Sequence, residues 1–180
     1  MQLGSRRIYS GRVINLDVDQ VQFPDGSKGE LEIVRHPGAA AVVPLASDPQ
    51  GDDPTILMIR QFRYATGGEL WEIPAGRLHH PGEDPEDCAR RELQEEVGVT
   101  AGVLQRLTTI WTTPGFSDES IHLFLASDLK TGTLAREPDE FIDVVPRAMS
   151  EVLEMIQTGE IRDGKTVVSI LYMAGFVLGH

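Results

Sequence analysis

Alternating apolar and polar positions predict β-strands over the first 75 residues of the chain. Apolar side chains recur at about every second position between residues 12 and 23, the Pro24-Asp25-Gly26 turn follows, and a second apolar run occupies residues 31–34. This pattern is typical of a β-hairpin. Further strands are predicted at residues 40–45, 55–59, 70–73, 103–109, 121–126 and 141–145.

Three later stretches have the apolar spacing of helices, at residues 85–97, 148–157 and 166–178. Asp84 is placed to cap the first helix and Gly98 to end it. Because strands dominate early and helices then alternate with strands, we expect an α/β (α+β) layered domain with a mixed β-sheet. We expect the hairpin region, residues 1–35, to be separable from the main domain, residues 36–180.

Length and composition fit one globular unit. The chain has 180 residues, of which 41% are hydrophobic and 24% charged, so it can bury a core. No apolar run approaches the roughly 20 residues that a membrane span needs. The first residues also lack the apolar stretch of a secretory signal. Cys88 is the single cysteine, which fits a reducing cytoplasm, and we expect a cytoplasmic protein.

The charge balance bears on the partners of the protein. Sixteen Lys and Arg against 28 Asp and Glu give a net charge of −12. A chain this acidic does not attract nucleic acid or an anionic membrane through its overall field, so we expect neither as a partner. If the substrate is an anion, a divalent cation is the obvious group to lie between the two.

An acidic stretch in the first predicted helix carries the candidate chemistry. Glu92, Glu95 and Glu96 are spaced so that their carboxylates gather on one helix face, where they repel one another. A solvated acidic face with ordinary ion pairs is the alternative. The preceding segment, Glu72-Ile73-Pro74-Ala75-Gly76, favours a metal site, because backbone carbonyls at such a turn are hard oxygen ligands beside the glutamates. Carboxylates, carbonyls and water are the ligands that Mg²⁺ and Mn²⁺ prefer.

At these residues the sequence resembles the Nudix hydrolase family. The box of that family reads Gly-x5-Glu-x7-Arg-Glu-U-x-Glu-Glu-x-Gly-U, where U is a bulky aliphatic residue. Here Gly76 opens the box, Glu83 is its first acid, and residues 91–99 close it. Six residues separate Gly76 from Glu83, one more than in the box of the family, and they form a loop that contains His79 and His80. The resemblance implies the Nudix fold, in which a mixed β-sheet lies between helices.

The resemblance also implies roles for the residues of the box. Arg91 would hold Glu83 and so orient the helix. The implied metal ligands are Glu92, Glu95, Glu96 and the backbone carbonyl of Ala75, binding two or three Mg²⁺ or Mn²⁺ ions. The implied reaction is attack of water on a nucleoside diphosphate linked to another group.

Segments outside the box resemble the ADP-ribose pyrophosphatase subfamily. They are Ile59–Tyr64 with Leu70–Gly76, and the loop Thr113–Glu119. The resemblance implies substrate contacts from Arg35, Arg63, Glu72, Pro114, Gly115 and Phe116. For Arg63 a surface ion pair is the alternative. Trp71 is better explained by core or dimer packing than by stacking on adenine.

The acidic loop near residue 140 resembles the segment from which the subfamily draws its catalytic base. Alignment of the following strand assigns Glu137 as the base and Asp139 as a further metal contact, with Glu140 as the rival base. His79 and His80 lack a third ligand at metal-binding spacing. Cys88 lacks a histidine partner of its own, so we expect a buried spectator and not a nucleophile.

The expected function is therefore metal-dependent hydrolysis of ADP-ribose to AMP and ribose 5-phosphate. The nearest alternative is the same chemistry on other nucleoside diphosphate sugars such as GDP-mannose, because metals at the box contact only the diphosphate. A catalytically silent Nudix metabolite sensor is a second alternative, which the complete set of acids disfavours. The resemblance further implies a homodimer, with the N-terminal strands at a shared site.

Overall fold

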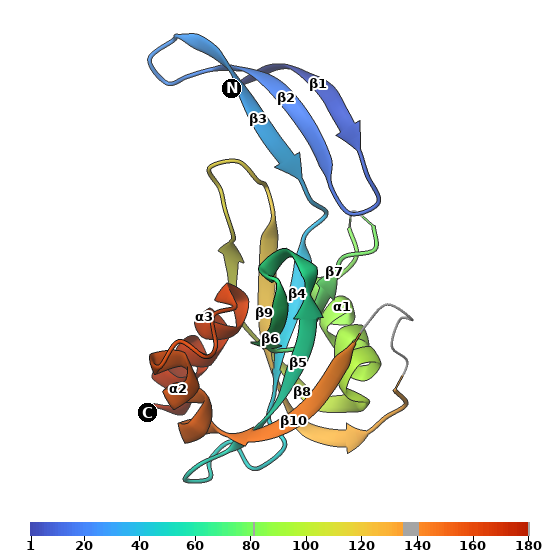
Figure 1. Ribbon diagram of the computed structural model, residues 1–180, viewed down its shortest axis with the longest axis vertical. Helices are drawn as coiled ribbons and strands as arrows, with labels where there is room; N and C mark the ends of the chain where they lie inside the picture. The colour runs from blue at the N-terminus through green and yellow to red at the C-terminus, as the bar shows by residue number, and fades with distance from the viewer. Residues whose placement is uncertain (81, 135–140, 180) are drawn as a thin grey trace.

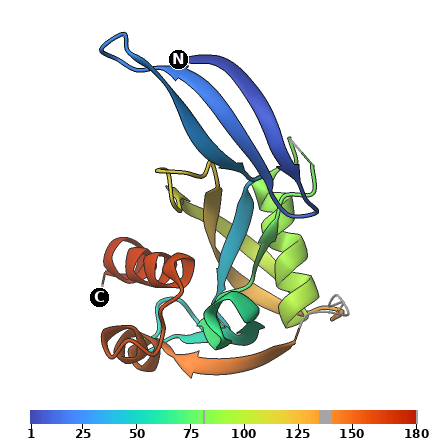
Figure 2. The same ribbon diagram turned by 45° about the horizontal axis from the view of Figure 1, so that its top comes forward.

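The computed structural model describes residues 1–80, 82–134 and 141–179. Three β-sheets and three helical segments make up this part of the chain (Figure 1). The N-terminal sheet projects from one end of the main body, as two views of the ribbon show (Figures 1 and 2).

The N-terminal sheet has three antiparallel strands, β1 (Gln2–Ser10), β2 (Asn15–Gln22) and β3 (Lys28–Arg35), in the order β1-β2-β3. The predicted hairpin corresponds to β2 and β3, joined by a turn in which Gly26 has a φ of 86°. The sequence pattern did not predict β1, because its segment QLGSRRIYS contains few apolar residues and exposes most of them. The predicted hairpin is therefore present as β2 and β3, and the prediction lacked the third strand, β1.

The central sheet has the strand order β7-β4-β9-β8. Its strands are β4 (Ala39–Pro44), β7 (Ala75–Arg77), β8 (Val99–Trp111) and β9 (Ser120–Thr131). β4 and β9 run parallel, whereas the β4–β7 and β8–β9 pairs are antiparallel. The sheet is therefore mixed, as the sequence predicted. With only three residues, β7 is too short for its pattern to be recognised.

A third, antiparallel sheet has the order β10-β5-β6. Its strands are β5 (Thr55–Arg63), β6 (Gly68–Glu72) and β10 (Ile142–Ala148), and the short 3₁₀ turn η1 (Tyr64–Thr66) joins β5 to β6. This connection brings the end of β5 beside the start of β6, so that Arg63 pairs with Gly68.

The helices agree closely with their predicted ranges. α1 (Pro85–Glu92) continues into the π-helical turn η2 (Leu93–Val97), α2 spans Met149–Gln157, and α3 (Gly164–Tyr172) continues into η3 (Met173–Leu178). The Asp84 side chain accepts a hydrogen bond from the Glu86 backbone and so caps α1. Gly98, with a φ of 78°, ends the helical segment in the left-handed region. The last helix begins two residues earlier than predicted, with Asp163 as its cap.

Strand β4 is buried on both faces and connects two hydrophobic clusters. Ala40 and Val42 pack with Leu93 and other residues of α1 and η2. Ala39, Ala41 and Val43 face the opposite cluster, which includes residues of α2 and α3. The central sheet therefore lies between helices, as Figures 1 and 2 show and as the sequence predicted.

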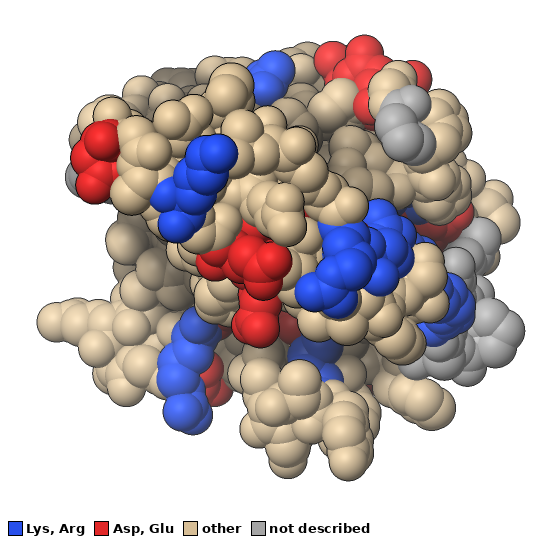
Figure 3. Space-filling model, turned by 90° about the horizontal axis from the view of Figure 1, so that it is seen from above, with Lys and Arg blue, Asp and Glu red and all other residues tan. Residues whose placement is uncertain are grey.

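The helices within residues 1–80, 82–134 and 141–179 include none with the length and apolar character of a membrane-spanning segment. Seen from the N-terminal end, basic side chains lie interspersed with acidic ones on the surface (Figure 3). The field of this face is therefore mixed in sign.

Candidate active site

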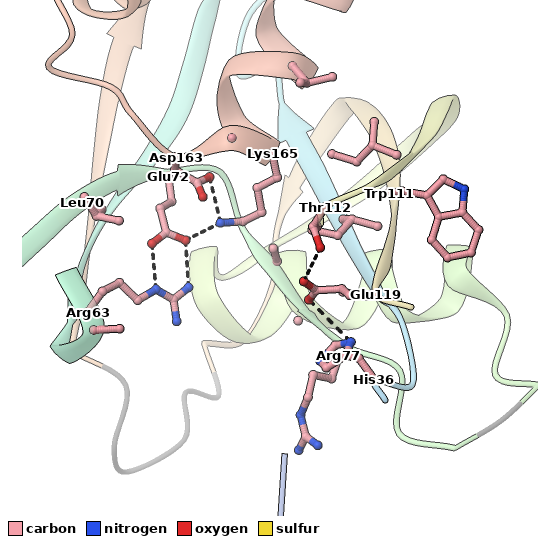
Figure 4. Close-up of a pocket in the computed structure, with 18 of the residues that line it drawn as sticks. His36, Arg63, Leu70, Glu72, Arg77, Trp111, Thr112, Glu119, Asp163 and Lys165 are labelled. Carbon is pink, nitrogen blue, oxygen red and sulfur yellow. Dashed lines mark hydrogen bonds and ion pairs between the residues drawn. The ribbon is translucent and has the colours of Figure 1, made fainter. Parts of the chain in front are cut away.

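A cavity of about 740 Å³ opens between the central sheet and the start of α3. Its floor includes a row of apolar residues that crosses three strands, since Ile110 on β8 pairs with Ile121 on β9, and Ile121 pairs with Ala39 on β4. Ala75 and Gly76, at the start of β7, also line the cavity. Charged side chains gather at two places on its wall (Figure 4).

The start of strand β7, at Ala75 and Gly76, lies directly on the acidic face of the α1–η2 helix. A Cβ atom on Gly76 would be 1.9 Å from Glu92 Oε1, so only glycine permits this approach. The backbone N–H of Ala75 donates a hydrogen bond to Glu96 Oε2 at 3.0 Å. Glu92 is 6% and Glu96 is 2% exposed. The alternative of a solvated acidic face is therefore wrong for these two glutamates.

Arg91 offsets part of the negative charge of this face. Its guanidinium contacts Glu92 at 2.5 Å and Glu95 at 3.2 Å through Nη1. Its distance to Glu83 is longer, 3.6 Å, whereas Nη2 donates to the Arg77 carbonyl at 3.0 Å. Arg91 thus ties the helix to β7 and bridges several acids, of which Glu83 is the most distant.

Glu83 has a second role in its loop. Its Oε2 accepts a hydrogen bond from the His79 backbone. Burial raises the pKa of Glu83, but this hydrogen bond and the charge of Arg91 outweigh that effect and lower it below its ordinary value. Glu83 therefore stays ionised at neutral pH and anchors the loop with the additional residue.

The donor set fits a hard divalent cation in its chemistry. Glu92, Glu95 and Glu96 offer carboxylate oxygens from one helix face, two of these side chains are buried, and the Ala75 backbone is bonded to Glu96. Within the described ranges, no three His, Cys, Asp or Glu side chains already converge as a metal-binding group. Arg91 occupies positions beside Glu92 and Glu95 that a cation would compete for.

A buried ion-pair network forms one charged part of the cavity wall. Arg63 Nε and Nη2 donate to the two carboxylate oxygens of Glu72 at 2.7 and 2.8 Å, and Lys165 Nζ lies 2.5 Å from Glu72 Oε2 (Figure 4). Glu72 is 1% exposed. Burial raises its pKa, but the bonds to Arg63 and the charge of Lys165 outweigh this and lower the pKa. The predicted pair Arg63 and Glu72 thus lies at the cavity, as an internal ion pair.

The other charged part contains His36 and Glu119. Glu119 Oε1 lies 3.5 Å from His36 Nδ1, and Thr112 Oγ1 donates to Glu119 Oε2 at 2.8 Å (Figure 4). Burial lowers the pKa of His36 and outweighs the charge of Glu119, which raises it. His36 is therefore mostly neutral at pH 7.

Four other predicted substrate residues lie outside the cavity lining. Pro114, Gly115 and Phe116 form a turn closed by the Phe116 N–H to the Thr113 carbonyl at 3.1 Å. Arg35 pairs instead with three carboxylates, at 3.2 Å from Asp17, 3.0 Å from Asp118 and in close contact with Asp19. In this chain, Arg35 therefore joins β2 and β3 to the 113–119 loop.

The predicted base Glu137, its rival Glu140 and the predicted metal contact Asp139 lie outside the described residues.

Sequence reasoning missed several residues of the cavity wall. Lys165 and Asp163 precede or begin the last helix, and the capping position of Asp163 was the available signal. Trp111 ends β8 and Thr112 follows it, directly before the loop whose resemblance was noted, so this neighbouring position in the sequence was the only indication.

Two residues considered in the sequence lie away from the cavity lining. Trp71 packs against the core and donates from Nε1 to Glu160 at 3.0 Å, while the Arg147 guanidinium lies 5.2 Å from its ring centre. Cys88 is buried, and burial raises the pKa of its thiol to about 12. A thiol with this pKa is protonated at neutral pH and is not a nucleophile.

Comparison with known proteins identifies the family. A family model described as the NUDIX domain matches residues 35–167. The ADP-ribose pyrophosphatase of Bacillus subtilis (strain 168) is 40% identical over 173 residues, covering 95% of this chain and 90% of the relative. The methanol dehydrogenase activator of Bacillus methanolicus is 40% identical over 171 residues, covering 94% and 89%.

A solved structure supports the fold. The crystal structure of an ADP compounds hydrolase superposes with a TM-score of 0.83, covering 99% of this chain and 94% of the other at 20% sequence identity. The matched residues include the glutamate helix, strand β7 with Gly76, and most of the residues that line the cavity. This chain therefore belongs to the Nudix hydrolase family.

Proposed function

We propose that this Nudix hydrolase cleaves the pyrophosphate bond of ADP-ribose to give AMP and ribose 5-phosphate. The observation that carries the proposal is the approach of Ala75 and Gly76, which begin β7 and line the cavity, to the buried carboxylates of Glu92 and Glu96. The Bacillus subtilis relative named ADP-ribose pyrophosphatase supports this substrate, because the similarity extends over nearly the whole length of both chains.

Nudix hydrolases generally need a divalent metal ion. For this chain we propose two or three Mg²⁺ or Mn²⁺ ions, held by Glu92, Glu95, Glu96, the Ala75 carbonyl and Asp139. Such ions would neutralise charge on the diphosphate and lower the pKa of a bound water. The net charge of −12 supports this requirement, because an anionic substrate otherwise meets repulsion at the glutamates.

The remaining roles belong to side chains of this chain. Arg63, held by Glu72, presents its guanidinium to the cavity and would bind a substrate phosphate oxygen. Glu137 would remove the proton from the attacking water, with Glu140 as its rival. Arg91 and Glu83 would keep the acidic helix in register with β7. Pro114, Gly115, Phe116 and Arg35 would contact substrate only at a site completed by a partner subunit.

We further propose that the enzyme is a cytoplasmic homodimer. Apolar side chains of the projecting N-terminal sheet are exposed in the single chain, among them Leu3, Ile8 and Leu31. A second copy covering this sheet would remove them from water. The buried free thiol of Cys88 suits a reducing compartment. Gel filtration should give twice the mass of one chain, and a monomer would contradict the shared site.

A substrate panel tests the proposed reaction. Purified protein is incubated with ADP-ribose, GDP-mannose, NADH and a diadenosine polyphosphate, each with Mg²⁺ and with Mn²⁺, and the products are separated by chromatography. We expect ADP-ribose to have the highest kcat/KM and to yield AMP and ribose 5-phosphate. A higher kcat/KM for GDP-mannose would replace the proposed substrate. Binding without turnover of any compound would indicate a metabolite sensor.

A further inference from the structure

The carboxylate of Glu72 is shared between two cations on the cavity wall. Arg63 holds both oxygens through Nε and Nη2, at 2.7 and 2.8 Å, and Lys165 Nζ approaches Oε2 at 2.5 Å (Figure 4). A charged carboxylate that is 1% exposed needs such partners, because burial disfavours its ionised form. The direction of the Glu72 side chain therefore depends on both cations.

Lys165 is itself fixed from the opposite side. Its Nζ lies 2.9 Å from Asp163 Oδ2, and the same oxygen accepts from the backbone N–H of Thr166 at 3.1 Å and from Thr166 Oγ1 at 2.6 Å. Thr166 is buried and its Oγ1 accepts a hydrogen bond from the Ile73 N–H at 3.0 Å. The start of α3 thus holds both the Lys165 ammonium and the backbone that leads to Ala75.

The two cations differ in what they offer to a ligand. Lys165 lies between two carboxylates and its side chain is 11% exposed, so its charge is already compensated. The Arg63 side chain is 40% exposed, and Glu72 takes only two of its three guanidinium nitrogens. The nitrogen of Arg63 that Glu72 does not hold is Nη1. A cavity ligand would therefore meet Arg63, whereas Lys165 acts behind it.

We propose that Lys165 is a positioning residue, which fixes the Arg63 guanidinium for a substrate phosphate by holding Glu72 in place. This inference rests on the proposed function of the cavity as a diphosphate site. It assigns to Lys165 an effect on substrate affinity that passes through Arg63. A carboxylate that is bonded to both lysine and arginine has less freedom to move than one bonded to arginine alone. It therefore fixes the orientation of the arginine guanidinium more closely.

Kinetics of three variants test the assignment. Lys165→Met removes the ammonium, Lys165→Arg keeps a cation, and Lys130→Met removes a lysine whose side chain lies exposed on β9. We expect Lys165→Met to raise KM for ADP-ribose about tenfold, as for a lost charged hydrogen bond, and to change kcat by less than about twofold. Lys165→Arg should restore most of the affinity, and Lys130→Met should match the parent. An unchanged KM in Lys165→Met, or no rescue by Lys165→Arg, would overturn the proposal.

A double-mutant cycle separates an effect through Arg63 from a direct contact. Arg63→Met is combined with Lys165→Met, and the rises in KM are compared. We expect Lys165→Met to add almost nothing once Arg63 is absent. Multiplicative rises in KM would mean that Lys165 contacts substrate independently, which contradicts a positioning role. If Lys165→Met does not fold by circular dichroism, Lys165→Gln replaces it in the cycle, since glutamine keeps a donor without the charge.

Failure of the proposed function can be told apart from failure of this inference. If the parent does not form AMP and ribose 5-phosphate from ADP-ribose, the proposed substrate is wrong, and the cycle is measured on the best diphosphate of the panel. If the parent turns over none of them, calorimetric binding of ADP-ribose gives the same comparison as ratios of Kd. Coupling between Lys165 and Arg63 supports the inference in either case, and its absence refutes it.

Discussion

The Glu92 carboxylate packs directly against the backbone of Gly76. A methyl group on Gly76 would lie 1.9 Å from Glu92 Oε1, so no side chain fits between the two residues. The first glycine and a later glutamate of the Nudix box are therefore joined in space. Glu92 is 16 residues further along the chain, at the end of helix α1, which brings it back to strand β7.

Gly76→Ala should abolish most activity through this contact. The added Cβ must displace the Glu92 carboxylate, so we expect kcat to fall by at least about 100-fold, as when a preorganised catalytic group is lost. Gly68→Ala is the matched control, because a Cβ there meets no atom within 4 Å. The kcat for hydrolysis of ADP-ribose is measured for both variants and the parent. A Gly76→Ala enzyme with the kcat of the parent would contradict the proposed metal site.

Glu96→Gln should inactivate the enzyme and leave the fold intact. The amide oxygen of glutamine can still accept from the Ala75 N–H, so the hydrogen bond at 3.0 Å survives while the negative charge is lost. We expect a loss of at least about 100-fold in kcat and nearly unchanged thermal unfolding. Removal of divalent metal from the parent with EDTA should likewise stop turnover, and added Mg²⁺ or Mn²⁺ should restore it. Full activity of Glu96→Gln, or turnover in EDTA, would refute the scheme.

Glu72→Gln should destabilise the protein at neutral pH and much less in acid. The pKa of Glu72 is lowered below its ordinary value of 4.5, so its charge contributes stability above that value. The contribution is lost as the pH falls through the lower pKa of the folded state, where the parent also becomes neutral at Glu72. We expect a loss of about 2–3 kcal/mol at pH 7, below the upper range for buried pairs because Arg63 is partly exposed. Urea unfolding at pH 7 and at pH 3 measures the difference. An equal loss at both values would show that the charge of Glu72 is not responsible.

Glu137→Gln and Glu140→Gln, compared side by side, should identify the general base. We expect Glu137→Gln to lower kcat about 100-fold or more, within the range typical of general-base loss, and Glu140→Gln to lower it much less. Pre-steady-state measurement of the hydrolysis step gives the clearest comparison. A larger loss in Glu140→Gln would transfer the assignment to that residue.

Local signals predicted the parts of the site that one segment encodes. The helix at 85–97 and the gathering of Glu92, Glu95 and Glu96 follow from helical spacing, with Asp84 and Gly98 at the ends. The sequence also indicated hard oxygen ligands at the turn. Their burial could not be predicted from spacing, because it depends on strand β7 lying over the helix.

Long-range contacts account for most of what the sequence did not predict. Lys165 meets Glu72 across 93 positions of the chain, and no local pattern specifies that meeting. Arg35 was assigned to substrate by resemblance, whereas folding surrounds it with Asp17, Asp19 and Asp118. The strand β1 lacks a periodic apolar face, so its pairing with β2 is the feature that defines it.

The attachment of the 113–119 loop to β3 has a mechanical consequence. Val34 donates to the Phe116 carbonyl at 2.8 Å and accepts from the Asp118 N–H at 3.2 Å, while Asp118 also receives the His36 N–H at 2.8 Å. These bonds join the loop to the base of the projecting sheet. A tilt of that sheet would therefore reach the cavity by two routes, through this loop to Thr112 and Glu119, and through the Arg77 Nη1 bond to the Arg12 carbonyl at 3.2 Å to strand β7.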